Sequence, residues 1–137
     1  ADPAMLNRAL EGVARVAKHD CLVAIISDFD GADESTTRLV ATLAQHNDVL
    51  AIPVYDPSST ELPEGGRLVV SEGEFQVELD LAKASTRRRV AEMADRRLAS
   101  IMSWQGEIGV PVLPISAGED ALDQVRLLLG RAAEARR

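Results

Sequence analysis

The sequence predicts an α/β domain built around a small parallel sheet. Two short apolar runs, at 21–26 and 49–54, are too short for helices and are bounded by polar residues. Such runs are typical of strands that are buried on both faces of a parallel sheet. Each run follows a segment whose apolar residues recur at helical spacing, at 6–18 and at 35–45. This alternation of helix and strand favours right-handed crossovers and parallel pairing.

Further elements complete the predicted fold. Two alternating runs around a glycine turn predict a β-hairpin inserted into the α/β layer. A long stripe of apolar residues predicts a helix, and an apolar run with two prolines predicts a short edge strand before a last helix. We place the hairpin strands at 67–71 and 75–81, the helix at 85–104 with Ser85 or Thr86 as its cap, the edge strand at 110–115 and the last helix at 120–129; Asp33 or Ser35 caps the helix before the second strand.

Length and composition indicate one domain with an aliphatic core. The chain has 137 residues, of which 46% are hydrophobic and only 3% aromatic, so Ala, Val, Leu and Ile must fill the core. We assign the single domain to 6–130. Residues 1–5 resemble a vector-derived extension, and 131–137 form a basic tail.

Net charge and hydropathy restrict the classes of partner that the chain is expected to bind. The formal net charge of −7 disfavours binding to the phosphate backbone of nucleic acids. No apolar run approaches the roughly 18 residues that a membrane span requires. With one cysteine no intrachain disulfide can form, and we expect a bacterial cytoplasmic protein.

The sequence lacks the common catalytic motifs. Glycine-rich phosphate loops, the HExxH zinc motif and paired cysteines are all missing. Ser27 has no flanking glycines of a nucleophile elbow. His19 and His46 each lie between a helix and a strand, where we expect them to cap helix C-termini. We therefore expect no enzymatic activity.

A polar cluster follows the predicted strands. Ser27, Asp28 and Asp30 come directly after the first strand, and Asp56 follows the second. Open α/β sheets bind ligands at this edge, and carboxylate oxygens suit Mg²⁺. The alternative is that Asp28 and Asp30 form an Asx-type turn that leads into the next helix.

Four segments together resemble a known family: "LVAIISDFD", "LAQHNDVLAIPVYDPSSTELPEGG", "RLVVSEGEFQVELD" and "RRRVAEMADRR". Over 6–129 the chain is similar to the C-terminal half of the bacterial family called domain of unknown function 58. The resemblance implies a partial von Willebrand factor A-like, Rossmann-like layer with about three parallel strands, flanking helices and a hairpin insertion. It also implies a link to MoxR-type AAA ATPases, which are encoded near such proteins.

The resemblance further implies a metal site that this chain leaves incomplete. Related A domains bind one divalent ion through a DxSxS turn, a threonine and an aspartate that Asp28 matches. The sequence has no DxSxS turn, since "DPSST" at 56–60 and "DESTT" at 33–37 lie elsewhere. A lone carboxylate does not retain Mg²⁺. We therefore expect no cofactor, with Mg²⁺ bound only if another chain or segment completes the site.

The resemblance covers only the C-terminal half of the family's domain. It therefore implies that the first predicted strand lacks a neighbouring strand on one side. An apolar edge strand is an open template for pairing with another chain. We therefore expect a two-fold homodimer with this strand at or near the interface. Its residues are Cys21, Leu22, Val23, Ala24, Ile25 and Ile26.

Together these observations predict a non-catalytic protein-interaction module that works with a protein partner such as a MoxR-type AAA ATPase. Two alternatives remain open. One is an Mg-dependent hydrolase, and the other is a small-ligand-binding α/β domain. Both would use the strand-end carboxylates.

Overall fold

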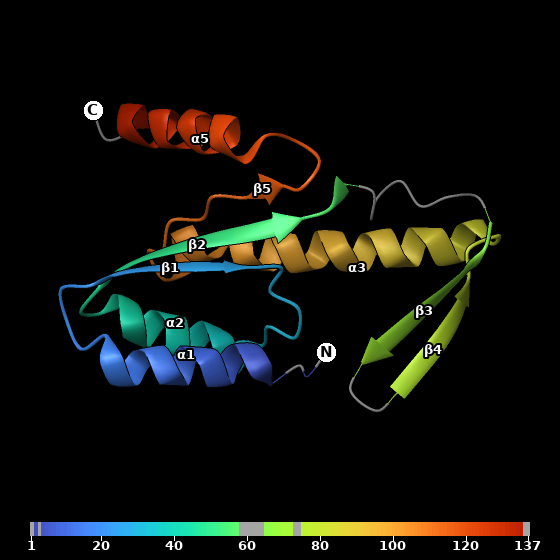
Figure 1. Cartoon of the computed structure of the whole chain (residues 1–137), viewed down its shortest axis with the longest axis horizontal. Helices are drawn as coiled ribbons and strands as arrows, with labels where there is room; N and C mark the ends of the chain where they lie inside the picture. The colour runs from blue at the N-terminus through green and yellow to red at the C-terminus, as the bar shows by residue number, and fades with distance from the viewer. Residues whose placement is uncertain (1, 3, 58–64, 73–74, 136–137) are drawn as a thin grey trace.

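The computed structural model of the chain describes residues 2, 4–57, 65–72 and 75–135 (Figure 1). Helices and strands alternate along its first half, and a hairpin and three helices follow. The elements are α1 (Met5–Val16), β1 (Leu22–Ser27), α2 (Glu34–Ala44), β2 (Asp48–Tyr55), β3 (Arg67–Glu72), β4 (Phe75–Asp80), α3 (Ala84–Met102), α4 (Trp104–Glu107), β5 (Ile115–Ser116) and α5 (Ala121–Ala135).

The sheet is open and parallel, with the strand order β1-β2-β5. β1 pairs with β2 along its whole length, and β5 pairs with the end of β2. This confirms the predicted α/β class. β5 is shorter than expected because Pro111 and Pro114 cannot donate to a ladder. Ahead of it only one bridge forms, in which Ala51 donates to the Pro111 carbonyl at 3.0 Å and accepts from the Leu113 N–H at 2.8 Å.

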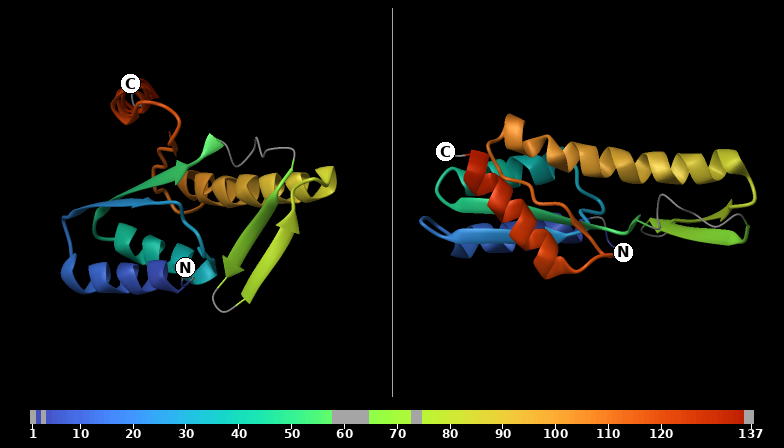
Figure 2. Two further views of the ribbon diagram at one scale, coloured as in Figure 1. Left: turned by 45° about the vertical axis from the view of Figure 1, so that its right-hand side comes forward. Right: turned by 90° about the horizontal axis from the view of Figure 1, so that it is seen from above.

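Only one face of β1 is covered, so the expectation that this strand is buried on both faces was wrong. Val23 and Ile25 are buried, whereas Leu22 and Ile26 are 75% and 68% exposed. Helices α2 and α3 lie on the covered side (Figure 2, right). The other side, here called the open face, has no layer of helices against β1 among the described residues. α1 lies beyond β1, and α5 lies beyond β5 at the opposite end of the sheet (Figure 1).

The core lies between the covered face and the helices behind it. Its strand residues pack with residues of α2, α3 and α4, and Leu10 of α1 belongs to the same buried cluster. As predicted it is mainly aliphatic, with one aromatic pair. The largest fully buried side chains are Trp104, Phe29, Val40 and Val110.

Two helix starts can be compared with the sequence. Asp33 caps α2 as expected, because its side chain accepts from the Thr36 N–H and the Thr36 hydroxyl accepts from the Asp33 N–H, each at 2.9 Å. α3 instead begins after Lys83 without a side-chain cap. The predicted cap at Ser85 or Thr86 was therefore wrong, since both residues lie in the first turn of the helix.

Helix ends differ more from the sequence prediction. α3 stops at Met102, and the backbone restarts as the short α4, whereas we expected one helix as far as Trp104. α5 continues to Ala135, past the predicted end at 129, so most of the basic tail is helical. The family-like segment 58–64 lies outside the described residues.

The predicted hairpin is confirmed. β3 and β4 are antiparallel, with Arg67 opposite Asp80 and Glu72 opposite Phe75. They form a separate two-stranded sheet that projects from the α/β layer beside the start of α3 (Figures 1 and 2). Residues 73–74 of the turn lie outside the described part of the chain.

Candidate functional site

The loop after β1 is a tight turn stabilised by its own side chains. The Ser27 hydroxyl accepts from the Phe29 N–H, and the Asp28 carboxylate accepts from the Asp30 N–H, both at 3.0 Å. Phe29 has φ of +54° and Gly31 has φ of +74°. This geometry matches the Asx-type turn that the sequence left as the alternative to a metal site.

Phe29 anchors that turn in the core. Its ring is fully buried and meets Trp104 edge to face, with centroids 5.5 Å apart. The Trp104 indole N–H donates to the Thr37 hydroxyl at 3.2 Å. The left-handed backbone at Phe29 is strained for a non-glycine residue, so burial of the ring must stabilise it. The loop is held by packing on α2 and α4.

The two loop carboxylates are engaged differently. Asp28 accepts the Asp30 N–H, while the Asp30 carboxylate forms an ion pair with Arg97 of α3 at 2.7 Å. Both members of that pair are about half exposed. A cation at this loop would meet the guanidinium of Arg97 as well as the carboxylates, which weakens its binding.

The remaining strand-end residues do not complete a metal centre. Asp56 is exposed after β2, and Ser116 is buried, where its backbone N–H and C=O pair with the Gln124 side-chain amide at 2.8 and 2.9 Å. Ser116 therefore fastens α5 to the sheet. Within the described ranges, no three His, Cys, Asp or Glu side chains converge to hold a metal, so Asp28, Asp30 and Asp56 do not form one cluster.

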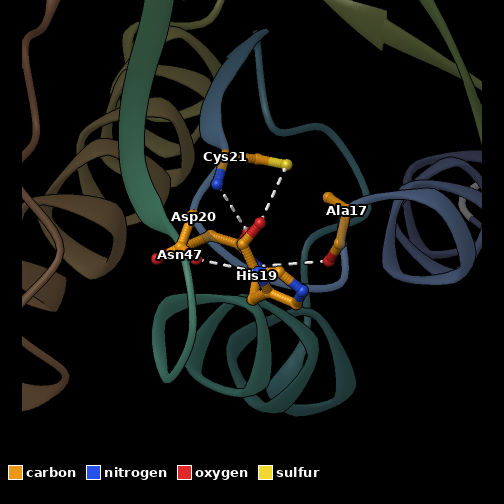
Figure 3. A network of polar contacts seen from close by, with 5 residues as sticks. All are labelled: Ala17, His19, Asp20, Cys21 and Asn47. Atoms are coloured by element: carbon orange, nitrogen blue, oxygen red, sulfur yellow. Dashed lines mark hydrogen bonds and ion pairs between the residues drawn. The ribbon is translucent and has the colours of Figure 1, made fainter.

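Asn47 organises the opposite end of the sheet (Figure 3). Its side-chain amide donates to the carbonyls of Ala17 and Leu43 at 3.2 and 3.0 Å and accepts from the Cys21 N–H at 3.1 Å. One side chain thus caps the C-terminal ends of α1 and α2 and holds the start of β1. The sequence prediction gave this capping role to His19 and His46 and missed Asn47. The sequence signal for this role was the position of Asn47 between a helix and a strand, since its side-chain amide can both donate and accept hydrogen bonds.

His19 has a different role from the one predicted. Its Nδ1 lies 2.8 Å from the Asp20 carboxylate, and its carbonyl accepts from the Cys21 thiol at 3.3 Å. Both side chains of the His19–Asp20 pair are highly exposed. This pair is therefore a local surface contact.

The outer side of β1 is a free strand edge. In a parallel pair, successive residues direct their N–H and C=O groups alternately to either side. The Cys21 carbonyl accepts from the Asp48 N–H of β2 at 2.9 Å. The amide groups of Leu22, Ala24 and Ile26 therefore point away from β2, and no other strand of the described chain pairs with them.

An apolar groove runs along this edge. It has a volume of about 600 Å³ and lies between α1 and β1. None of the side chains that line it is charged. They include Ala9, Gly12, Val13 and Val16 of α1 with Leu22 and Ala24 of β1.

The chain also exposes more surface than a compact monomer. A folded monomer of 14.7 kDa is expected to expose about 6,900 Å², whereas this chain exposes 9579 Å². The difference of about 2,700 Å² includes the projecting hairpin as well as the open face.

The fold and this surface define an α/β domain with an open sheet edge. Comparison with known proteins places it in a family. The model of the family described as protein of unknown function DUF58 matches residues 1–100, and the chain belongs to that family. No solved structure matches the chain.

Three similar proteins come from mycobacteria. The chain is 31% identical over 128 residues to the uncharacterized protein MAV169 of Mycobacterium avium, covering 92% of this chain and 75% of that protein. It is also 31% identical over 125 residues to the uncharacterized proteins Mb1516 of Mycobacterium bovis and Rv1480 of Mycobacterium tuberculosis. These matches cover 90% of this chain and 39% of each relative, so the chain spans about two fifths of their length. Among the described residues, no helix is long and apolar enough to cross a membrane.

Proposed function

We propose that the chain is a non-catalytic protein-interaction module, a partial von Willebrand factor A-like domain that lacks the DxSxS half of the metal site. The open apolar face and edge of β1 carry this proposal. Large exposed apolar surfaces mark interaction sites in soluble proteins. The engagement of Asp28 in a turn and of Asp30 in an ion pair supports the absence of a catalytic centre.

The partner proposed is a MoxR-type AAA ATPase, in the cytoplasm. Support comes from the family resemblance together with the open face. The test is a binding assay between this chain and the ATPase encoded beside it, with a Leu22→Lys variant for comparison. Leu22 is 75% exposed, so a charge there leaves the core intact and weakens binding through the open face.

When the ATPase is not bound, a second copy of the chain is proposed to pack on the same open face as a two-fold homodimer. Leu22, Ala24 and Ile26 present their side chains on the open face, whereas Val23 and Ile25 point into the core. This arrangement would make the 21–26 strand part of the interface.

Light scattering tests the dimer. We expect twice the chain mass at micromolar concentration and the single mass for Ile26→Lys. Met93 of α3 is 64% exposed, so Met93→Lys adds the same charge on a helix behind the sheet and should leave the dimer intact. A monomer for the unchanged chain at that concentration would contradict the dimer, and failure to bind the ATPase as well would contradict the module.

A further inference from the structure

We draw no further inference here: the strongest candidate, the uncharged groove between α1 and the free edge of β1, carries nothing because the chain spans about two fifths of its longer relatives and nothing in the described part of the structure shows what covers this edge.

Discussion

At the scale of single residues, Phe29 stabilises the loop after β1. It holds a left-handed backbone, is fully buried, and packs against Trp104. We expect Phe29→Ala to lower the free energy of unfolding by about 3–5 kcal/mol, since it leaves a cavity beside the only tryptophan. Urea unfolding followed by tryptophan fluorescence measures this. Asp30→Ala, which removes a half-exposed ion pair with Arg97, should cost about 1 kcal/mol or less, and a similarly small loss for Phe29→Ala would contradict the anchoring role.

Asp33 adds a pH-dependent contribution at the start of α2. The backbone N–H of Thr36, followed by the Asn7 side chain, lowers the pKa of this carboxyl from its ordinary value. A carboxyl with a lowered folded-state pKa stabilises the fold above its unfolded pKa and loses that contribution as pH falls through the folded value. Stability should therefore fall below about pH 4. Urea midpoints between pH 5 and 2.5 should decline less for Asp33→Ser, which keeps a cap without a charge. Identical slopes for the two proteins would contradict this.

At the scale of elements, successive residues of β1 alternate between the open face and the covered face of the sheet. Ile25 is 7% exposed and its neighbour Ile26 is 68% exposed. We expect Ile25→Ala to cost about 2–5 kcal/mol and Ile26→Ala to cost about 0.5 kcal/mol or less in the monomer. Chemical unfolding at low protein concentration compares the two. Equal losses would mean that the open face is covered in solution, and a loss under about 1 kcal/mol at Ile25 would contradict its place in the core.

The elements were largely predictable because hydrophobic spacing is a local signal. The 21–26 and 49–54 runs and the alternating hairpin strands all became strands. Which faces of β1 are buried was not predictable, because this depends on which helices cover the sheet rather than on the strand itself. The break of α3 at Ser103 has no strong sequence signal, since neither glycine nor proline stands at that position and the Ser103 backbone itself keeps a helical conformation.

Side-chain caps were likewise predictable only where the capping contact is local in the sequence. Asp33 could be identified because its partner Thr36 lies three residues away. Asn47 was harder to identify, because only its contact with Leu43 is local, whereas Cys21 and Ala17 lie 26 and 30 residues away in the sequence. Contacts that depend on how two helices converge are set by the tertiary fold.

At the scale of the whole molecule, the strand-end carboxylates could be located from the sequence but their geometry could not. Ser27 is the last residue of β1, Asp28 and Asp30 follow that strand, and Asp56 follows β2. The pattern left open whether they converge on a cation or form a turn. The Arg97 side chain, which comes from a helix 67 residues later and pairs with Asp30, could not be read from the local motif. The open edge was inferred from the sequence, whereas the groove required the position of α1.

Metal binding tests this picture of the whole molecule. Mg²⁺ needs several oxygen ligands in near-octahedral geometry, and the described chain brings no three acidic or metal-ligating side chains together. We expect calorimetric titration of Mg²⁺ or Mn²⁺ to give only heats of dilution for the unchanged chain and for Asp28→Ala. Asp28→Asn is the matched control, because it keeps an oxygen that can accept the Asp30 N–H. Tight binding that Asp28→Ala abolishes would instead mean that a second copy or another segment completes a site around Asp28.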